Sequence, residues 1–145
     1  MKKSSNVQVG NAFRDQVKEI FEKQGKGTFT PEVTIKIGDP ASGHRFDLAN
    51  TDNSIVVECK NYTWTSAGNV PSAKLMGLDE AVFYFGFLPA NTKKLLCMKR
   101  SEFPGKKETL AQYYVRMHGH LLRDVSVYEF SDNGDIRILR EGAKK

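Results

Sequence analysis

The stretch from residue 32 to residue 60 constrains the fold most strongly, because apolar and β-branched residues alternate with polar ones along it. Three segments carry this pattern: Val33–Ile37, Arg45–Ala49 and Ser54–Lys60. Turn-forming residues separate them, namely Gly38-Asp39-Pro40 and Thr51-Asp52-Asn53. The sequence therefore predicts three strands joined by short turns in an antiparallel meander.

The second turn of this meander brings two acidic residues together. We take Asp52 and Asn53 as the two loop residues of a tight hairpin. Counting outward along both strands then places Asp47 directly opposite Glu58. Like charges at such positions, with Cβ atoms about 4.5–5.5 Å apart, destabilise a sheet unless something offsets them. A divalent cation would do so, and Mg²⁺ suits oxygen ligands, usually taking one or two carboxylates together with water and substrate phosphate oxygens.

Lys60 adds a cationic group to the same face. It lies two residues beyond Glu58, so both side chains project from one face of the strand, whereas Cys59 projects from the other. A bound cation can generate hydroxide near neutral pH and stabilise charge on a phosphate, while a lysine orients or deprotonates the attacking water. The pattern predicts phosphodiester hydrolysis; an ordinary solvated strand face with a Lys–Glu pair is the alternative reading.

The rest of the chain alternates between helical and strand patterns. Apolar residues at helical spacing predict a helix over residues 11–24, which Gly25 and Gly27 end. Two more helices are predicted over 71–81 and 108–122. Further strands are predicted over 82–88, 95–98, 125–130 and 136–139, the last two forming a hairpin across Asp132-Asn133-Gly134. With no interdomain linker in between, residues 1–145 are expected to form a single domain.

The segments Arg45-Phe46-Asp47-Leu48 and Val57-Glu58-Cys59-Lys60, with eleven residues from Asp47 to Glu58, resemble the PD-(D/E)xK nuclease superfamily. The resemblance covers about residues 10–90 and lacks the proline that usually precedes the first acid. It implies an α/β fold of the restriction-endonuclease-like type, with a mixed central sheet and an α-βββ-α-β core flanked by helices. It also implies an endonuclease that hydrolyses DNA with Mg²⁺, for which Mn²⁺ would substitute.

The same resemblance implies roles for individual residues. Asp47 and Glu58 would be metal ligands, with the backbone carbonyl of Cys59 as a further one, and Lys60 would activate or position water. Members of the superfamily often carry another acidic residue on the first helix, for which Glu19 is preferred over Asp15. They also often have a polar residue on the helix after the third strand, and here Lys74 is the candidate.

The formal charge of +5 is concentrated in one segment, residues 91–123, which holds eight basic residues and two acidic ones. Phosphate contacts with DNA would explain this imbalance and would make binding sensitive to salt, although a solvated surface is the simpler reading. Trp64 could stack on bases, or it could be a packing residue. The residues expected to contact nucleic acid are Lys74, Trp64, Lys93, Lys94, Lys99, Arg100, Lys106, Lys107 and Arg116.

Composition limits the remaining possibilities. No apolar run approaches the roughly 20 residues that span a bilayer, and Met1–Ser5 is not followed by the apolar stretch of a signal peptide, so a cytoplasmic or otherwise intracellular protein is expected. The two cysteines indicate neither a disulfide framework nor a zinc cluster. Cleavage of both strands of duplex DNA, as by a restriction or homing enzyme, would be easiest for a homodimer or higher homo-oligomer.

Three alternatives stay open at this point. A junction-resolving or repair nuclease would use the same residues. The absent proline, and Arg14 at a position where an acid would fit, agree with a catalytically inactive nucleic-acid-binding module of the same fold. A structural or partner-binding protein would carry the acidic hairpin only incidentally, and its affinity for DNA would be weak.

Overall fold

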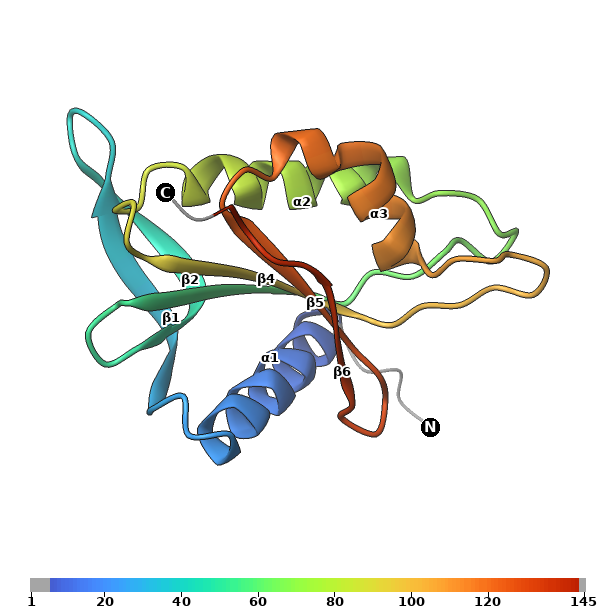
Figure 1. Cartoon of the computed structure of the whole chain (residues 1–145), viewed down its shortest axis with the longest axis horizontal. Helices are drawn as coiled ribbons and strands as arrows, with labels where there is room; N and C mark the ends of the chain where they lie inside the picture. Colours follow the sequence, from blue (N-terminus) through green and yellow to red (C-terminus); the bar gives the residue numbers. More distant parts are fainter. Residues whose placement is uncertain (1–5, 144–145) are drawn as a thin grey trace.

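The computed structural model describes residues 6–143, which form a six-stranded mixed sheet between helices on both faces (Figure 1). The strands follow one another across the sheet in sequence order. The helices are α1 (Asn6–Lys23), α2 (Ser72–Phe85) and α3 (Leu110–His118), with a 3₁₀ turn η1 (Gly119–Leu121). The strands are β1 (Phe29–Ile37), β2 (Ser42–Asn50), β3 (Ile55–Lys60), β4 (Lys93–Lys99), β5 (Val125–Phe130) and β6 (Ile136–Arg140).

Strand direction changes across the sheet in a way that positions the loops. Strands β1, β2 and β3 pair antiparallel, β3, β4 and β5 pair parallel, and β6 returns antiparallel to β5. The parallel pairs need long crossovers, which contain α2 and α3. The carboxyl ends of β3, β4 and β5 therefore lie side by side. We call this end of the sheet, where these strands finish, the carboxyl edge.

The core has one apolar cluster on each face of the sheet. On one face, α1 buries Phe13, Val17 and Phe21, which recur at helical spacing. The ring centre of Phe13 lies 5.8 Å from that of Phe130. Helices α2 and α3 cover the other face, for example through the fully buried Leu78. The result is a three-layer helix–sheet–helix arrangement.

Residues 82–85 of the aromatic run form the end of α2 and residues 86–88 form a turn after it, so the prediction of a strand over 82–88 is wrong. Val82 and Phe85 are buried in the last turns of α2, together with Leu78, whereas Phe83 is 61% exposed. That distribution fits a helix with one apolar face. The run resembled a buried strand because the solvent side of α2 also carries large apolar side chains.

The other predicted elements are present, with shifted ends. The first helix begins at Asn6, the strand predicted over 95–98 is β4, and β5 and β6 form the expected closing hairpin. The observed order is therefore α-βββ-α-β-α-ββ. None of the helices within residues 6–143 is long and apolar enough to cross a membrane.

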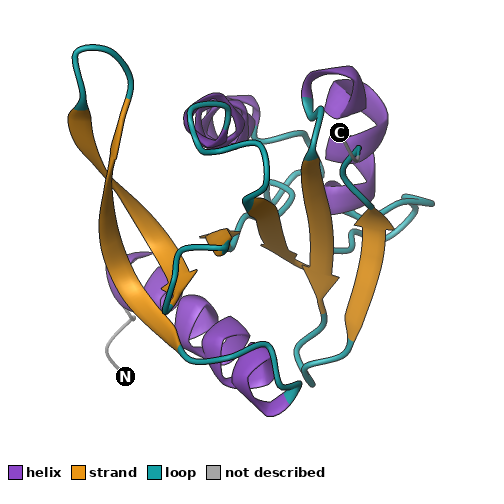
Figure 2. Cartoon of the chain, turned by 60° about the vertical axis from the view of Figure 1, so that its left-hand side comes forward, coloured by secondary structure: helices purple, strands orange, loops and turns teal. Residues whose placement is uncertain are grey.

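Strands β1 and β2 form a long ribbon that extends past the sheet (Figure 2). Their pairing continues from Phe29 and Asn50 to Ile37 and Ser42, whereas the β2–β3 ladder contains only Leu48 and Ala49 from β2. The half of the ribbon beyond this ladder packs on α2 instead. There the ring of His44 stacks on that of Tyr84, with 3.7 Å between the ring centres. Asp47 thus lies where the ribbon leaves the sheet.

Candidate active site

Asp47 and Glu58 face each other across β2 and β3, in the register that the sequence predicts. Leu48 pairs with Val57, so the next pair outward joins the two acids. The loop itself is longer than expected, because residues 51–54 all lie outside the strands and the side chain of Asn50 accepts the N–H of Ile55. The longer loop keeps the same register.

Each carboxylate is fixed by a backbone N–H of the other strand. The Asp47 N–H donates to Oε1 of Glu58 at 3.1 Å, and the Cys59 N–H donates to Oδ2 of Asp47 at 2.7 Å. These bonds use one oxygen of each carboxylate. The two acids are therefore held side by side, with Oδ1 of Asp47 and Oε2 of Glu58 outside these backbone bonds.

The environment of Glu58 disfavours its charge. Its side chain is buried, which raises its pKa to about 8, and the negative charge of Asp47 contributes in the same direction. Lys60 opposes the rise from 4.0 Å away. An ionised Glu58 beside Asp47 thus needs more positive charge than the chain supplies at that point.

The donor set fits a hard divalent cation that keeps much of its water. Asp47 and Glu58 offer carboxylate oxygens, which Mg²⁺ prefers, and Mg²⁺ usually uses only one or two protein carboxylates. Over residues 6–143, no group of three or more His, Cys, Asp or Glu side chains comes together to hold a metal. A cation here would complete its shell with water and substrate oxygens.

Lys60, whose ammonium lies 4.0 Å from Glu58, lines a common cleft with Lys74, although neither Asp47 nor Glu58 is among the residues that line it. The cleft has a volume of about 280 Å³ and lies between the start of α1, the end of β3 and the start of α2. Tyr62 also lines it, and the Lys74 ammonium lies 6.0 Å from the centre of the Tyr62 ring. The structure therefore brings together Lys60 and the helix residue predicted from the resemblance.

Cys59 contributes its backbone more than its side chain. Its N–H binds Asp47, while its thiol lies on the other face of β3, opposite Cys97 in the β3–β4 register. Burial is the main cause that raises the pKa of the Cys59 thiol. The role of its carbonyl as a metal ligand stays a prediction.

Glu19, the predicted acid on the first helix, lies away from this cleft. Its carboxylate is exposed and pairs with Lys23 at 2.9 Å. Gly10 lines the cleft, and Glu19 is nine residues further along α1, or about 13 Å at 1.5 Å per residue. The alternative candidate, Asp15, pairs with Arg14. Neither side chain joins Asp47 and Glu58 in this structure.

His44 is a neighbour of the site that sequence reasoning missed. Its ring lies between Tyr84 and Phe46, and burial is the largest cause that lowers its pKa. The charges of Glu80 and Asp47 act in the opposite direction, which places His44 within electrostatic reach of Asp47. No sequence motif marks it, because its partner Tyr84 lies in a run that reads as a strand.

The basic segment divides between the two ends of β4. Lys93 and Lys94 lie where β4 begins, about 20 Å along the strand from Lys99. Lys94 is buried and paired with Asp124, so it cannot contact DNA and that prediction is wrong. Lys93 is exposed, but at the edge opposite Lys60.

The remaining basic residues lie on the carboxyl-edge side, and four of these five side chains lie near an acid or an aromatic ring. Lys99 pairs with Asp132, Arg100 with Glu102, and Arg116 with Glu108, while the Lys106 ammonium lies 4.4 Å from the centre of a Trp64 ring. Lys107 is exposed in the loop before α3.

Trp64 is a packing residue, as the alternative reading held. It is 6% exposed, and its indole N–H donates to the carbonyl of Ser101 at 3.1 Å. Its backbone N–H donates to the Ser101 hydroxyl. These contacts tie the loop after β3 to the loop after β4, so the ring is not free to stack on a base.

Comparison of the chain with protein-family models, with curated proteins and with solved structures finds no match.

Proposed function

We propose that this chain is a metal-dependent endonuclease that hydrolyses phosphodiester bonds of DNA. The observation that carries the proposal is the pairing of Asp47 with the buried Glu58, each locked by a backbone N–H, with Lys60 4.0 Å away. Such an arrangement concentrates negative charge that a cation offsets, beside a lysine and an open cleft. The likeness of its two motifs to the PD-(D/E)xK superfamily supports the same conclusion.

The residues of the site would divide the chemistry. Asp47 and Glu58 would hold Mg²⁺, which when bound activates water and stabilises charge on the phosphate. Lys60 would orient the attacking water or take its proton, and Lys74 would hold a phosphate oxygen from the other side of the cleft. Loss of Lys60 would then reduce the rate more than the affinity for DNA.

The substrate would be DNA, and double-stranded cleavage at specific sites is the form we favour. One chain has one Asp47–Glu58 pair, so cleavage of both strands would be simplest in a homodimer or higher homo-oligomer. A junction-resolving or repair nuclease would use the same site on a branched or damaged substrate.

The inactive nucleic-acid-binding module is a second candidate because the two acids considered on the first helix do not join the site. Glu19 pairs with Lys23 and Asp15 pairs with Arg14. A site with two protein carboxylates would hold a cation more weakly than one with three. The module would bind DNA equally well in EDTA and would never cut it.

The test is cleavage of a long, sequence-diverse duplex with Mg²⁺ and with EDTA, by the wild type, Lys60→Ala and Lys23→Ala. Lys23 is a matched control, because it is an exposed lysine at the end of α1, thirteen residues or about 20 Å along the helix from Gly10 in the cleft. We expect Mg²⁺-dependent cutting that Lys60→Ala loses, with binding retained, and that Lys23→Ala keeps. Binding without cutting of duplex, branched or single-stranded DNA would instead identify the inactive module.

A further inference from the structure

A second cavity, of about 570 Å³, opens at the carboxyl edge beyond the end of β4. Four basic side chains line it against two acidic ones, Glu102 and Glu108. The basic ones are Arg100, Lys106, Lys107 and Arg137. The cavity is therefore cationic, and two of its cations are arginines, whose planar forks match phosphate oxygens.

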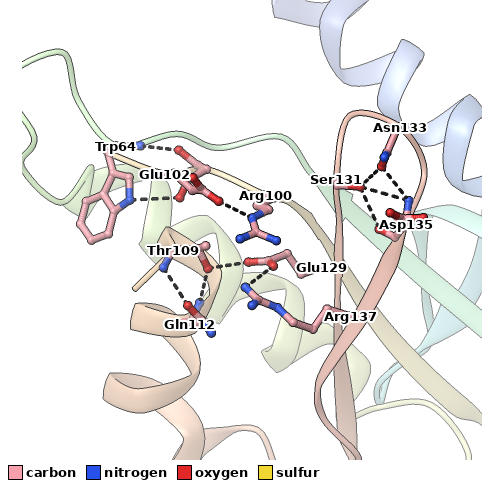
Figure 3. A network of polar contacts seen from close by, with 11 residues as sticks. Trp64, Arg100, Glu102, Thr109, Gln112, Glu129, Ser131, Asn133, Asp135 and Arg137 are labelled. Atoms are coloured by element: carbon pink, nitrogen blue, oxygen red, sulfur yellow. Dashed lines mark hydrogen bonds and ion pairs between the residues drawn. The ribbon is translucent and has the colours of Figure 1, made fainter. Parts of the chain in front are cut away.

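A buried carboxylate holds one of these arginines in place (Figure 3). Glu129 on β5 is 1% exposed, and it accepts hydrogen bonds from the hydroxyl of Thr109 and from Arg137, whose nitrogen lies 2.6 Å away. The side chain of Arg137 is nevertheless 41% exposed. Glu129 thus orients a guanidinium whose outer part faces the cavity.

Arg100 also pairs with a carboxylate, that of the exposed Glu102. Its Nε donates to Glu102 at 2.6 Å, and Figure 3 shows its guanidinium beside Glu129 and Arg137. Side chains that are already oriented lose less entropy when they bind a ligand. The arginine pair is therefore organised before any anion arrives.

The charges around the arginine pair indicate the side from which an anion would approach. A neighbouring cavity of about 510 Å³ shares Arg100 and Arg137 but is also lined by Asp132 and Asp135. The first cavity instead has Lys106 and Lys107, and the start of α3 adds partial positive charge there. An anion would bind on the lysine side.

The cationic cavity and the cleft at Lys60 lie along the same edge of the sheet. Lys60 pairs with Met98, two residues before Arg100, and Arg137 lies on β6, three strands from β3. At about 4.8 Å per strand and 3.3 Å per residue along a strand, the backbone of Arg100 lies about 8 Å from that of Lys60, and the backbone of Arg137 lies about 14 Å from it. One strand of B-DNA carries a phosphate about every 3.4 Å along its axis, so this span corresponds to about two to four nucleotides.

We propose that this cavity binds a backbone phosphate of the DNA strand whose cleavage occurs at Lys60, a few nucleotides from the hydrolysed bond. The proposal rests on the nuclease function above, since it takes its ligand from that substrate. The arginines would grip the phosphate oxygens, while Lys107 would add charge at the rim. The contact carries no sequence information and sets the position of the strand.

The test is the salt dependence of DNA affinity, measured by fluorescence anisotropy of a short labelled duplex in EDTA, where no cleavage interferes. Each lost phosphate contact reduces the steepness of the plot of log affinity against log salt concentration by about 0.9. If the variant and the wild type bind equally at 1 M salt, this difference makes the variant bind about eightfold more weakly at 0.1 M salt. We expect this change for Arg100→Ala and Lys107→Ala, both at exposed side chains. Arg100→Lys should keep most of the slope, and Lys23→Ala, at an exposed lysine outside the predicted DNA contacts, should keep all of it.

The outcomes separate this proposal from the nuclease function. Wild-type slopes in both alanine variants would overturn the cavity and leave the nuclease proposal intact. Reduced slopes in a protein that never cuts DNA with Mg²⁺ would support the cavity and overturn the nuclease proposal. A chain that binds neither duplex nor single-stranded DNA would overturn both.

Discussion

Replacing Glu58 by glutamine should stabilise the metal-free protein at alkaline pH. The ordinary pKa of a glutamate is 4.5, and burial beside Asp47 raises that of Glu58 to about 8. The folded protein therefore keeps a proton that the unfolded chain releases as the pH rises through this interval. The stability from that proton is fully present below pH 4.5 and is lost as the pH rises through about 8.

The size of the effect follows from the same difference. At about 1.4 kcal/mol per pKa unit, the interval from 4.5 to about 8 sets an upper limit of about 5 kcal/mol. Glutamine cannot ionise and can still accept the N–H of Asp47 through its carbonyl. We expect Glu58→Gln to gain at least about 2 kcal/mol over the wild type at pH 8, or roughly 6 °C in Tm for a chain of this size.

The assay is thermal unfolding in EDTA, followed by circular dichroism from pH 5 to pH 9. The wild type should lose Tm relative to Glu58→Gln as the pH rises, and the two curves should meet near pH 5. Glu19→Gln is the matched control, because the exposed Glu19 pairs with Lys23 and has a lowered pKa. Wild-type and Glu58→Gln curves that stay parallel across this range would refute the reasoning.

Three other predictions use different parts of the structure. Added Mg²⁺ should raise the Tm of the wild type, more at pH 8 than at pH 6 because the ligand must lose its proton, and this gain should vanish in Asp47→Asn. Val82→Asp should unfold the chain while Phe83→Asp leaves its Tm within a few degrees, since only Val82 is buried in α2; the reverse ranking would contradict the helix. Thr109→Ala should cost about 2 kcal/mol in denaturant unfolding, because Thr109 caps α3 and donates to the buried Glu129, whereas Thr109→Ser should restore most of it.

The meander and its register could be predicted from the sequence because both depend on local rules. Alternation of apolar and polar residues identifies the strands, and the turn residues after Asn50 fix which residues face each other. The observed loop, residues 51–54, is two residues longer than the predicted one. Asp47 still lies opposite Glu58, because adding one residue on each side of a turn preserves the pairing. The pairing of the two acids was predictable for that reason.

The features that could not be predicted depend on contacts between distant segments. The run at 82–88 is apolar on every side, so its period does not distinguish a helix from a strand. The burial of Lys94 depends on Asp124, thirty residues later, and the stack of His44 on Tyr84 depends on how the ribbon packs against α2. Charge counted along the sequence likewise hides the division of the basic residues between opposite ends of β4.

The way in which the two acids are held suggests why the site lies where the ribbon leaves the sheet. In a continuous ladder, the N–H groups of Asp47 and Cys59 would bind carbonyls of neighbouring strands, and the side chains would be free to turn away from each other. Here both N–H groups bind carboxylates instead. Two like charges stay adjacent because the backbone that holds them would otherwise lose its own hydrogen bonds, which costs about 1–3 kcal/mol for each buried group. The end of the β2–β3 ladder thus supplies the donors that fix the two acids, and under the proposed function a cation and a phosphate would approach them from that end.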